Sequence, residues 1–235
     1  MKTGWLRVLA GMAVSGLLIG NGYAGTTIPP TADANGSYAG NEGSSIPLDG
    51  SGSSGSGLIY DWDFGDGDSA TDAGNAPTHT YADNGSYTVS LTVTDVAGES
   101  STAQSLAEIF NVAPTVDPIS DSFIPSGAVL DLLVTFSDPG IFDNPWSFLF
   151  DWGDSSSTTS GTVASISPIS VSHIYTGSVG TMFNGSVSIT DKDGGLFTRP
   201  FLTTLIASQV PEPTTLALLS LGLVGLGIAR HKKKT

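Results

Sequence analysis

The chain has 235 residues, among them 30 glycines and no cysteine, and its formal net charge is −14 at pH 7. No lysine or arginine lies between Arg7 and Lys192, so the body of the chain would repel the phosphate backbone, which excludes nucleic-acid binding. The lack of cysteine likewise excludes thiol catalysis, disulfide bonds and cysteine-ligated metals.

Residues 1–24 have the pattern of a secretory signal peptide. A basic start at Lys2 and Arg7 precedes an apolar stretch, which ends in the small-residue pattern of Gly22 and Ala24. This order is typical of a signal helix that directs export, and signal peptidase would cut after Ala24. The rest of the chain is therefore expected outside the inner membrane.

Residues 25–110 are predicted to form a first β-sandwich. Apolar and polar residues alternate over residues 87–94, and Tyr60, Trp62 and Phe64 also fall at alternate positions. Such period-two alternation indicates strands with one buried face. Asn-Gly and Asp-Gly pairs supply turns between the strands, and no stretch of the body has a convincing helical period.

The stretch DWDFGDGD, residues 61–68, brings four aspartates within eight positions. Alternation places Asp61 and Asp63 opposite the aromatic face, and the four residues after Phe64 then have the composition of a turn. A calcium loop of EF-hand type needs glycine at its sixth position, where this stretch has Asp66. We interpret the stretch as a strand with its turn; a contact with a metal or a partner is the alternative, and a catalytic carboxylate pair is disfavoured.

Residues 111–208 repeat the landmarks of the first unit in the same order. The sequences WDFGDG at 62–67, HTY at 79–81 and YTVSLTVTD at 87–95 correspond to FDWGDS at 150–155, HIY at 173–175 and FNGSVSITD at 183–191. A second, divergent β-sandwich of the same kind is therefore predicted. In it Ser155 replaces Gly67, and Gly185 weakens a strand or marks a close approach.

Residues 209–235 close the chain with three parts. The triplet Pro211-Glu212-Pro213 precedes an apolar stretch at 214–229, and a basic tail follows with Arg230, Lys232, Lys233 and Lys234. As a helix this stretch would be about 24 Å long, which is short for a hydrocarbon core of ~30 Å. The basic tail would stay cytoplasmic. We expect a short transmembrane helix that holds the precursor transiently, with the body of the protein facing outward.

The three parts of the C-terminus resemble the PEP-CTERM sorting signal. The resemblance implies a Gram-negative bacterium, recognition by an exosortase, and release or transfer of the protein to the cell surface or extracellular matrix, often with exopolysaccharide. The alternative is a plain tail anchor in which the two prolines only delay the start of a helix.

Residues 31–110 resemble the polycystic kidney disease (PKD) domain through the LDGS turn at 48–51, the signature at 62–67, HTY at 79–81 and the strand at 87–94. Residues 112–207 resemble it more distantly. The resemblance implies an all-β fold of two tandem immunoglobulin-like sandwiches, in addition to the signal helix and the short transmembrane helix. Modules of this family usually serve binding, spacing or adhesion and are seldom catalytic.

The function predicted is that of an exported, non-catalytic surface or matrix protein whose modules bind an extracellular polysaccharide or a surface protein. The candidate contact is the loop with Phe142, Asn144 and Trp146, since aromatic side chains stack on sugars, but a place in the core is favoured for these aromatics. A second hypothesis is a structural spacer without a ligand. No enzyme is expected, because His79 and His173 fall at equivalent places in the repeat and no hydrolase motif occurs.

No cofactor is predicted, with calcium as the alternative. Some relatives of the PKD domain bind calcium through acidic residues that follow the LDGS turn, and residues 53–57 here contain no carboxylate. The sequence DKDG at 191–194 is a weaker candidate and has the composition of a hairpin turn.

Overall fold

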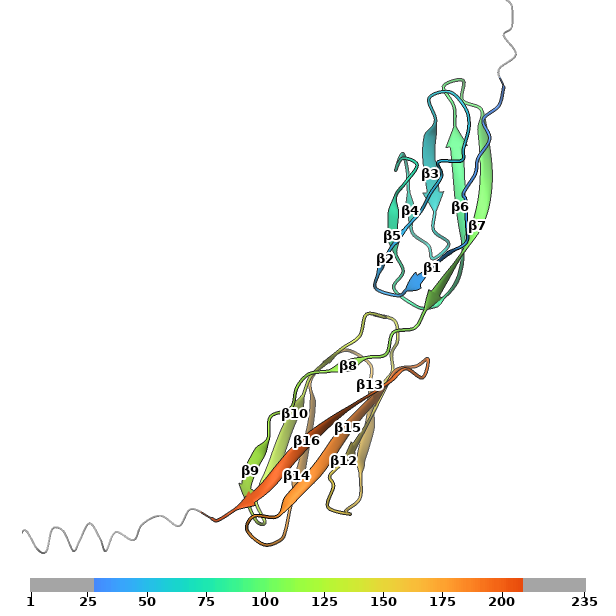
Figure 1. Cartoon of the computed structure of the whole chain (residues 1–235). Helices are drawn as coiled ribbons and strands as arrows, with labels where there is room; N and C mark the ends of the chain where they lie inside the picture. The colour runs from blue at the N-terminus through green and yellow to red at the C-terminus, as the bar shows by residue number, and fades with distance from the viewer. Residues whose placement is uncertain (1–27, 209–235) are drawn as a thin grey trace, which may run out of the picture.

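The computed structural model describes residues 28–208, which form two β-sandwich modules placed end to end (Figure 1). Within this range every regular element is a strand, and no helix that could span a membrane is found there. The predicted signal helix, the cleavage point at Ala24, the sorting triplet, the transmembrane helix and the basic tail lie outside the described residues.

The first module comprises residues 28–110. Its strands are β1 (Tyr38–Asn41), β2 (Ser45–Pro47), β3 (Ile59–Asp63), β4 (Ser69–Ala70), β5 (Thr78–Thr80), β6 (Gly85–Thr94) and β7 (Ser100–Phe110). One sheet has the order β1-β7-β6-β3-β4, and β2 pairs with β5 in the other. Strand β1 runs parallel to β7, whereas the other pairs are antiparallel.

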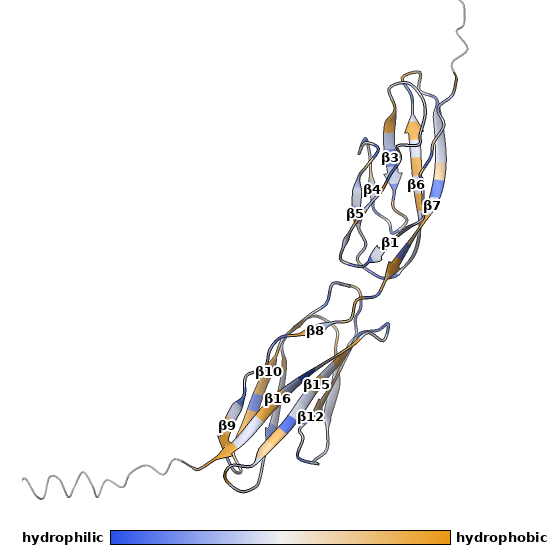
Figure 2. Cartoon of the chain, viewed as in Figure 1, coloured by the Kyte–Doolittle hydropathy of each residue, from blue (hydrophilic) through white to orange (hydrophobic). Residues whose placement is uncertain are grey.

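The core of the first module follows the alternation in the sequence. Along β6 the side chains of Val89, Leu91 and Val93 are fully buried, and the polar residues between them are not. Trp62 lies opposite Leu91 in the register of β3 and β6 and is only 1% exposed. Figure 2 shows the same alternation of apolar and polar residues along β6. The predicted strand faces are therefore confirmed.

The second module comprises residues 111–208. Its strands are β8 (Thr115–Val116), β9 (Ser122–Pro125), β10 (Val129–Val134), β11 (Phe136–Ser137), β12 (Trp146–Asp151), β13 (Thr159–Val163), β14 (Ile169–Ile174), β15 (Met182–Thr190) and β16 (Leu196–Ile206). The larger sheet has the order β13-β12-β15-β16-β9, and the pairs β10-β14 and β11-β8 complete the module. Strand β9 runs parallel to β16, as β1 does to β7, so both modules share this arrangement.

Gly185 interrupts the buried face of β15 for a packing reason. A Cβ at this position would lie 2.3 Å from Cζ of Phe201 and 2.9 Å from the carbonyl oxygen of Asp151. The glycine lets the ring of Phe201, on the neighbouring strand β16, close over the backbone. The sequence left two interpretations of Gly185, a weakened strand or a close approach, and the structure shows the close approach.

Candidate functional site

The aspartate-rich stretch folds as the end of β3 and a tight turn. Gly65 and Gly67 have φ angles of +85° and +102°, in the region that favours glycine, and a Cβ on Gly65 would lie 2.5 Å from the carbonyl oxygen of Thr88. The Asp63 carboxylate accepts a hydrogen bond from the amide of Gly65 at 2.9 Å, and Asp66 accepts one from the amide of Asp68 at 3.1 Å. The carboxylates therefore shape the turn, which the composition of the four residues after Phe64 predicted.

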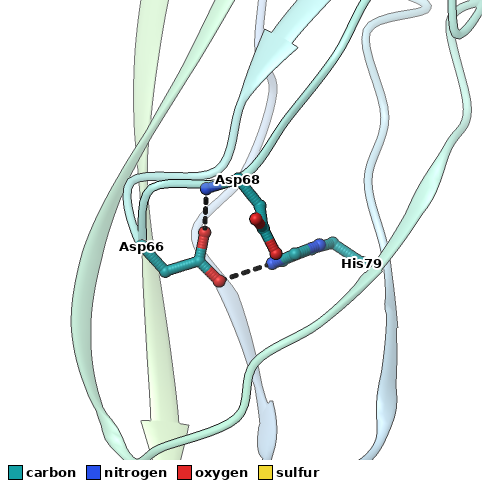
Figure 3. A group of neighbouring side chains, drawn as sticks. All are labelled: Asp66, Asp68 and His79. Atoms are coloured by element: carbon teal, nitrogen blue, oxygen red, sulfur yellow. Dashed lines mark hydrogen bonds and ion pairs between the residues drawn. The ribbon is translucent and has the colours of Figure 1, made fainter.

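This turn brings Asp66 to the ring of His79. Figure 3 shows Asp66, Asp68 and His79 together, with Nε2 of His79 2.7 Å from Oδ2 of Asp66. The imidazole stacks on Phe64 with ring centroids 4.0 Å apart, and the edge of Tyr81 packs against it at 4.6 Å. The Tyr81 hydroxyl donates to the carbonyl of Phe64, and burial raises the pKa of Tyr81 to about 12. The histidine is thus fixed by two rings and a carboxylate.

The second module repeats this arrangement. Nε2 of His173 lies 2.7 Å from Oδ2 of Asp154, the imidazole stacks on Trp152, and Tyr175 donates to the carbonyl of Trp152. Burial by itself would raise the pKa of Asp154, but the hydrogen bonds from Ser156 and His173 outweigh it and lower that pKa. A pair that recurs at the same place in both modules ties a turn to the sheet.

The group formed by Asp66, Asp68 and His79 in the first module, by contrast, has no complete counterpart among the described residues of the second module. Ligand atoms of Asp66, Asp68 and His79 lie within 4.8 Å of one another, an arrangement that could hold a metal ion. The residue at the place of Asp68 in the second module is Ser156, whose amide donates to Asp154 just as Asp68 donates to Asp66. The trio is therefore the repeated His–Asp pair with one added carboxylate.

A hollow of about 420 Å³ adjoins this turn, at the junction of the two modules. The first module lines it with Asp66, Asp68, Asp83 and Tyr87, and the second module contributes Phe142. Phe142 is 57% exposed. Carboxylates and an exposed aromatic ring are thus brought to one surface from both modules.

The three residues of the predicted contact loop separate in the structure. Phe142 reaches the hollow and Asn144 is exposed, whereas Trp146 begins β12 and is 2% exposed. The indole N–H of Trp146 donates to Oδ2 of Asp138 at 2.7 Å, and its ring meets the edge of Phe136. The structure thus places Trp146 in the core of the second module, and Phe142 and Asn144 at its surface.

Sequence reasoning missed a group of charged side chains beside the hollow. Nζ of Lys192 donates to carboxylates of Asp83 at 2.7 Å, Asp143 at 2.9 Å and Asp193 at 2.5 Å, and so bridges both modules. The isolation of Lys192 in a body nearly free of cations was the one signal that could have marked it. Its neighbours Asp191 and Gly194 form the predicted hairpin turn, closed by backbone hydrogen bonds.

Glu42 lies close to Asp83 and Asp143. It is fully buried, although it directly follows the short edge strand β1. Its Oε1 accepts a hydrogen bond from the amide of Val112, in the linker, at 2.7 Å. Burial raises the pKa of Glu42 to about 7, opposed by the Val112 amide and reinforced by the charge of Asp143. Burial also raises the pKa of Asp143, although Lys192 opposes that rise.

Two family models match this chain. Residues 27–109 match the PKD domain, and residues 209–233 match the PEP-CTERM protein-sorting motif. The chain therefore carries a PKD domain as its first module and a sorting motif beyond its second, as both resemblances predicted.

Several similar proteins match a segment of about one module of this chain. A segment of 92 residues, 38% of this chain, is 37% identical to the pre-pro-metalloprotease PrtV of Vibrio cholerae and covers 10% of it. A segment of 73 residues, 30% of this chain, is 45% identical to the collagenase ColA of Bacillus cereus and covers 7% of it. The crystal structure of the PKD1 domain of the Vibrio cholerae protease is 39% identical, with 35% of this chain and 98% of that domain covered and a TM-score of 0.29.

Proposed function

We propose that this protein is an exported, exosortase-sorted surface or matrix protein without catalytic activity, which binds an extracellular polysaccharide at the junction of its modules. The observation that carries the proposal is the hollow where Phe142 faces Asp66, Asp68 and Asp83. An exposed ring offers a face on which a sugar stacks, and ionised carboxylates accept hydrogen bonds from sugar hydroxyls. The site combines both types of group.

The charge of the protein narrows the class of ligand. The hollow is lined by carboxylates, and Lys192 and Arg199 are the only lysine and arginine between residues 25 and 208. Lys192 is already engaged with three carboxylates, and Arg199 donates to the carbonyl of Val116. Acidic polymers would be repelled. We therefore propose an uncharged, hydroxyl-rich polysaccharide, with a surface protein as the alternative ligand.

Substitution of the exposed ring tests this site. Phe142→Ala should weaken retention of the full-length chain on an uncharged polysaccharide by about tenfold or more, because central aromatic contacts dominate binding. Phe123→Ala is the matched control, since Phe123 is 62% exposed on β9 of the same module and does not line the hollow. Equal retention of both variants, or retention of an acidic polymer in place of the uncharged one, would refute the proposed site.

Sorting is tested separately at the C-terminus. The proposal assigns recognition by exosortase to Pro211-Glu212-Pro213 together with the apolar stretch and basic tail, after signal peptidase has cut at Ala24. Replacing the triplet by alanines should leave a membrane-held precursor whose intact mass includes the C-terminal residues. A variant with the wild-type mature mass and location would contradict exosortase processing and favour a plain tail anchor.

A structural spacer remains the second candidate, supported by the bridge from Lys192 to Asp83 and Asp143 across the junction. A spacer needs a fixed arrangement of modules and no ligand. Replacing residues 28–208 by an unrelated pair of sandwiches should then preserve surface attachment and any matrix phenotype. Loss of the phenotype in the replaced chain, together with its loss in Phe142→Ala, would decide for binding.

A further inference from the structure

Two buried carboxylates meet at the module junction without enough donors to satisfy them. Glu42 comes from the first module and Asp143 from the second, and both side chains are 0% exposed. No donor from any other described residue reaches Oε2 of Glu42 or Oδ2 of Asp143, although the two carboxyl groups also interact with each other through a side-chain hydrogen bond. Two adjacent buried carboxyl groups are costly unless a proton or a cation lies between them, and a divalent cation can take the place of that proton.

A third carboxylate completes the group. Oxygen atoms of Glu42, Asp83 and Asp143 lie within 4.8 Å of one another. Two of these acids belong to the first module, whereas Asp143 lies in the loop before β12 of the second. The three acids are thus distant in sequence and converge only because the modules meet.

The backbone holds the two buried carboxylates in place. A Cβ on Gly140 would lie 2.2 Å from Oδ2 of Asp143 and 2.7 Å from Cδ of Glu42, so only a glycine leaves room for both. The amide of Val112 fixes Oε1 of Glu42 from the other side. The free oxygens are therefore preorganised by packing rather than by a donor.

Lys192 supplies only part of the positive charge required. Its Nζ donates to Oδ1 of Asp143, to Asp83 and to Asp193. Oδ2 of Asp143 and Oε2 of Glu42 receive no hydrogen bond from this ammonium. No further basic side chain between residues 28 and 208 contacts this group. One ammonium faces more carboxylates than it can balance.

A neighbouring group of acids differs from this one in an instructive way. Asp138, Asp143 and Asp191 also lie within 4.8 Å of one another. However, Asp138 accepts hydrogen bonds from Gly140 and Trp146, and Asp191 accepts them from two amides and from Asn111. The carboxylates of Asp138 and Asp191 therefore already have donors within the protein. Glu42 and Asp143 are the acids here that keep an oxygen without such a donor, so a cation is expected beside them.

We propose that Glu42, Asp83 and Asp143 form a binding site for a divalent cation of the Ca²⁺ class that joins the two modules. All three residues offer oxygen ligands, which hard cations prefer, and no nitrogen or sulfur ligand belongs to the group. Ca²⁺ accepts irregular sets of oxygens more readily than Mg²⁺, which requires near-octahedral geometry. The cation would approach Oδ2 of Asp143 while Lys192 keeps Oδ1.

The proposed cation site shares Asp83 with the hollow, so Ca²⁺ alone is the probe and no polysaccharide is present in the test. Ca²⁺ added to the full-length, chelator-treated chain should give a saturable rise in melting temperature, with a smaller rise for Mg²⁺. Glu42→Gln should weaken Ca²⁺ binding in calorimetry by about tenfold or more, because it removes a charged ligand but can still accept the hydrogen bond from Val112. Asp131→Asn, an exposed acid on β10 outside the metal-ligating groups, is the matched control.

Hydrogen exchange shows whether the cation acts between the modules. The amide of Val112 should exchange more slowly with Ca²⁺ present, because its acceptor Glu42 becomes fixed. Absence of calorimetric binding by the wild-type chain would overturn the proposal. So would binding that survives Glu42→Gln and is lost in Asp66→Asn, since this would place the cation at the Asp66, Asp68 and His79 trio.

Discussion

Truncation of Trp62 gives the most direct measure of how the first module is stabilised. Trp62 is 1% exposed in the middle of the larger sheet, paired with Leu91 on β6. Trp62→Ala should lower the free energy of unfolding by about 3–5 kcal/mol, the range for buried large-to-small changes. The indole N–H also donates to the carbonyl of Gly74 at 3.0 Å. Gly74 is exposed, so water can replace that donor, and the lost packing dominates the cost.

The assay is calorimetric or chemical unfolding of the full-length chain, with each module followed separately by hydrogen exchange. The loss should fall on residues 28–110, because the two cores contain different residues. Phe110→Ala serves as the control, since Phe110 is 51% exposed, and it should cost less than about 1 kcal/mol. A loss below about 1 kcal/mol for Trp62→Ala would refute the claim that this ring is a central part of the core.

Three further substitutions test single features of the second module. Ser155 has a φ angle of +66°, so Ser155→Gly should stabilise by about 1 kcal/mol in urea unfolding, and a loss would contradict strain there. Gly185→Ala should cost about 1–3 kcal/mol because its Cβ would strike Phe201, and an unchanged melting temperature would show that the ring moves freely. Lys192→Gln should cost about 2–3 kcal/mol by leaving Asp143 buried without its cation. Burial lowers the pKa of Lys192, but its carboxylate partners outweigh this and raise it above the ordinary 10.5, so its stabilising contribution is complete below that value. A loss that shrinks between pH 7 and 9 would contradict the assignment, whereas ionisation of Glu42, whose pKa is about 7, would enlarge the loss.

Much of the fold could be predicted because the signals are local. Alternation along β6 fixes which side chains are buried whatever the rest of the chain does, and Val89 to Val93 follow it. Glycines in the Asp66 turn likewise report a backbone conformation that few other residues adopt. The repeat then extends each inference from the first module to the second, including the equivalent places of His79 and His173. Their pairing with Asp66 and Asp154 is visible only in the structure.

The junction could not be predicted because it depends on how one module meets the other. Glu42 and Asp143 are far apart in sequence, and neither belongs to an alternating strand pattern that indicates burial. The position of Trp146 shows a related difficulty at smaller scale. It alternates with Phe150 and Trp152, which favours the core, but it also follows the loop with Phe142, so the sequence leaves both a contact and a core position open.

Differences between the two copies show which features the shared fold does not require. Features needed for folding recur in both modules. Asp95 in the turn after β6 and Asp191 in the turn after β15 each accept hydrogen bonds from two backbone amides. The next residue is Val96 in the first module, 77% exposed, and Lys192 in the second, where it reaches across to Asp83. A change at an equivalent turn that leaves the fold intact is free to serve another purpose. Lys192 thus gives the junction an ion-paired contact between the modules that the equivalent turn of the first module, with Val96, does not provide.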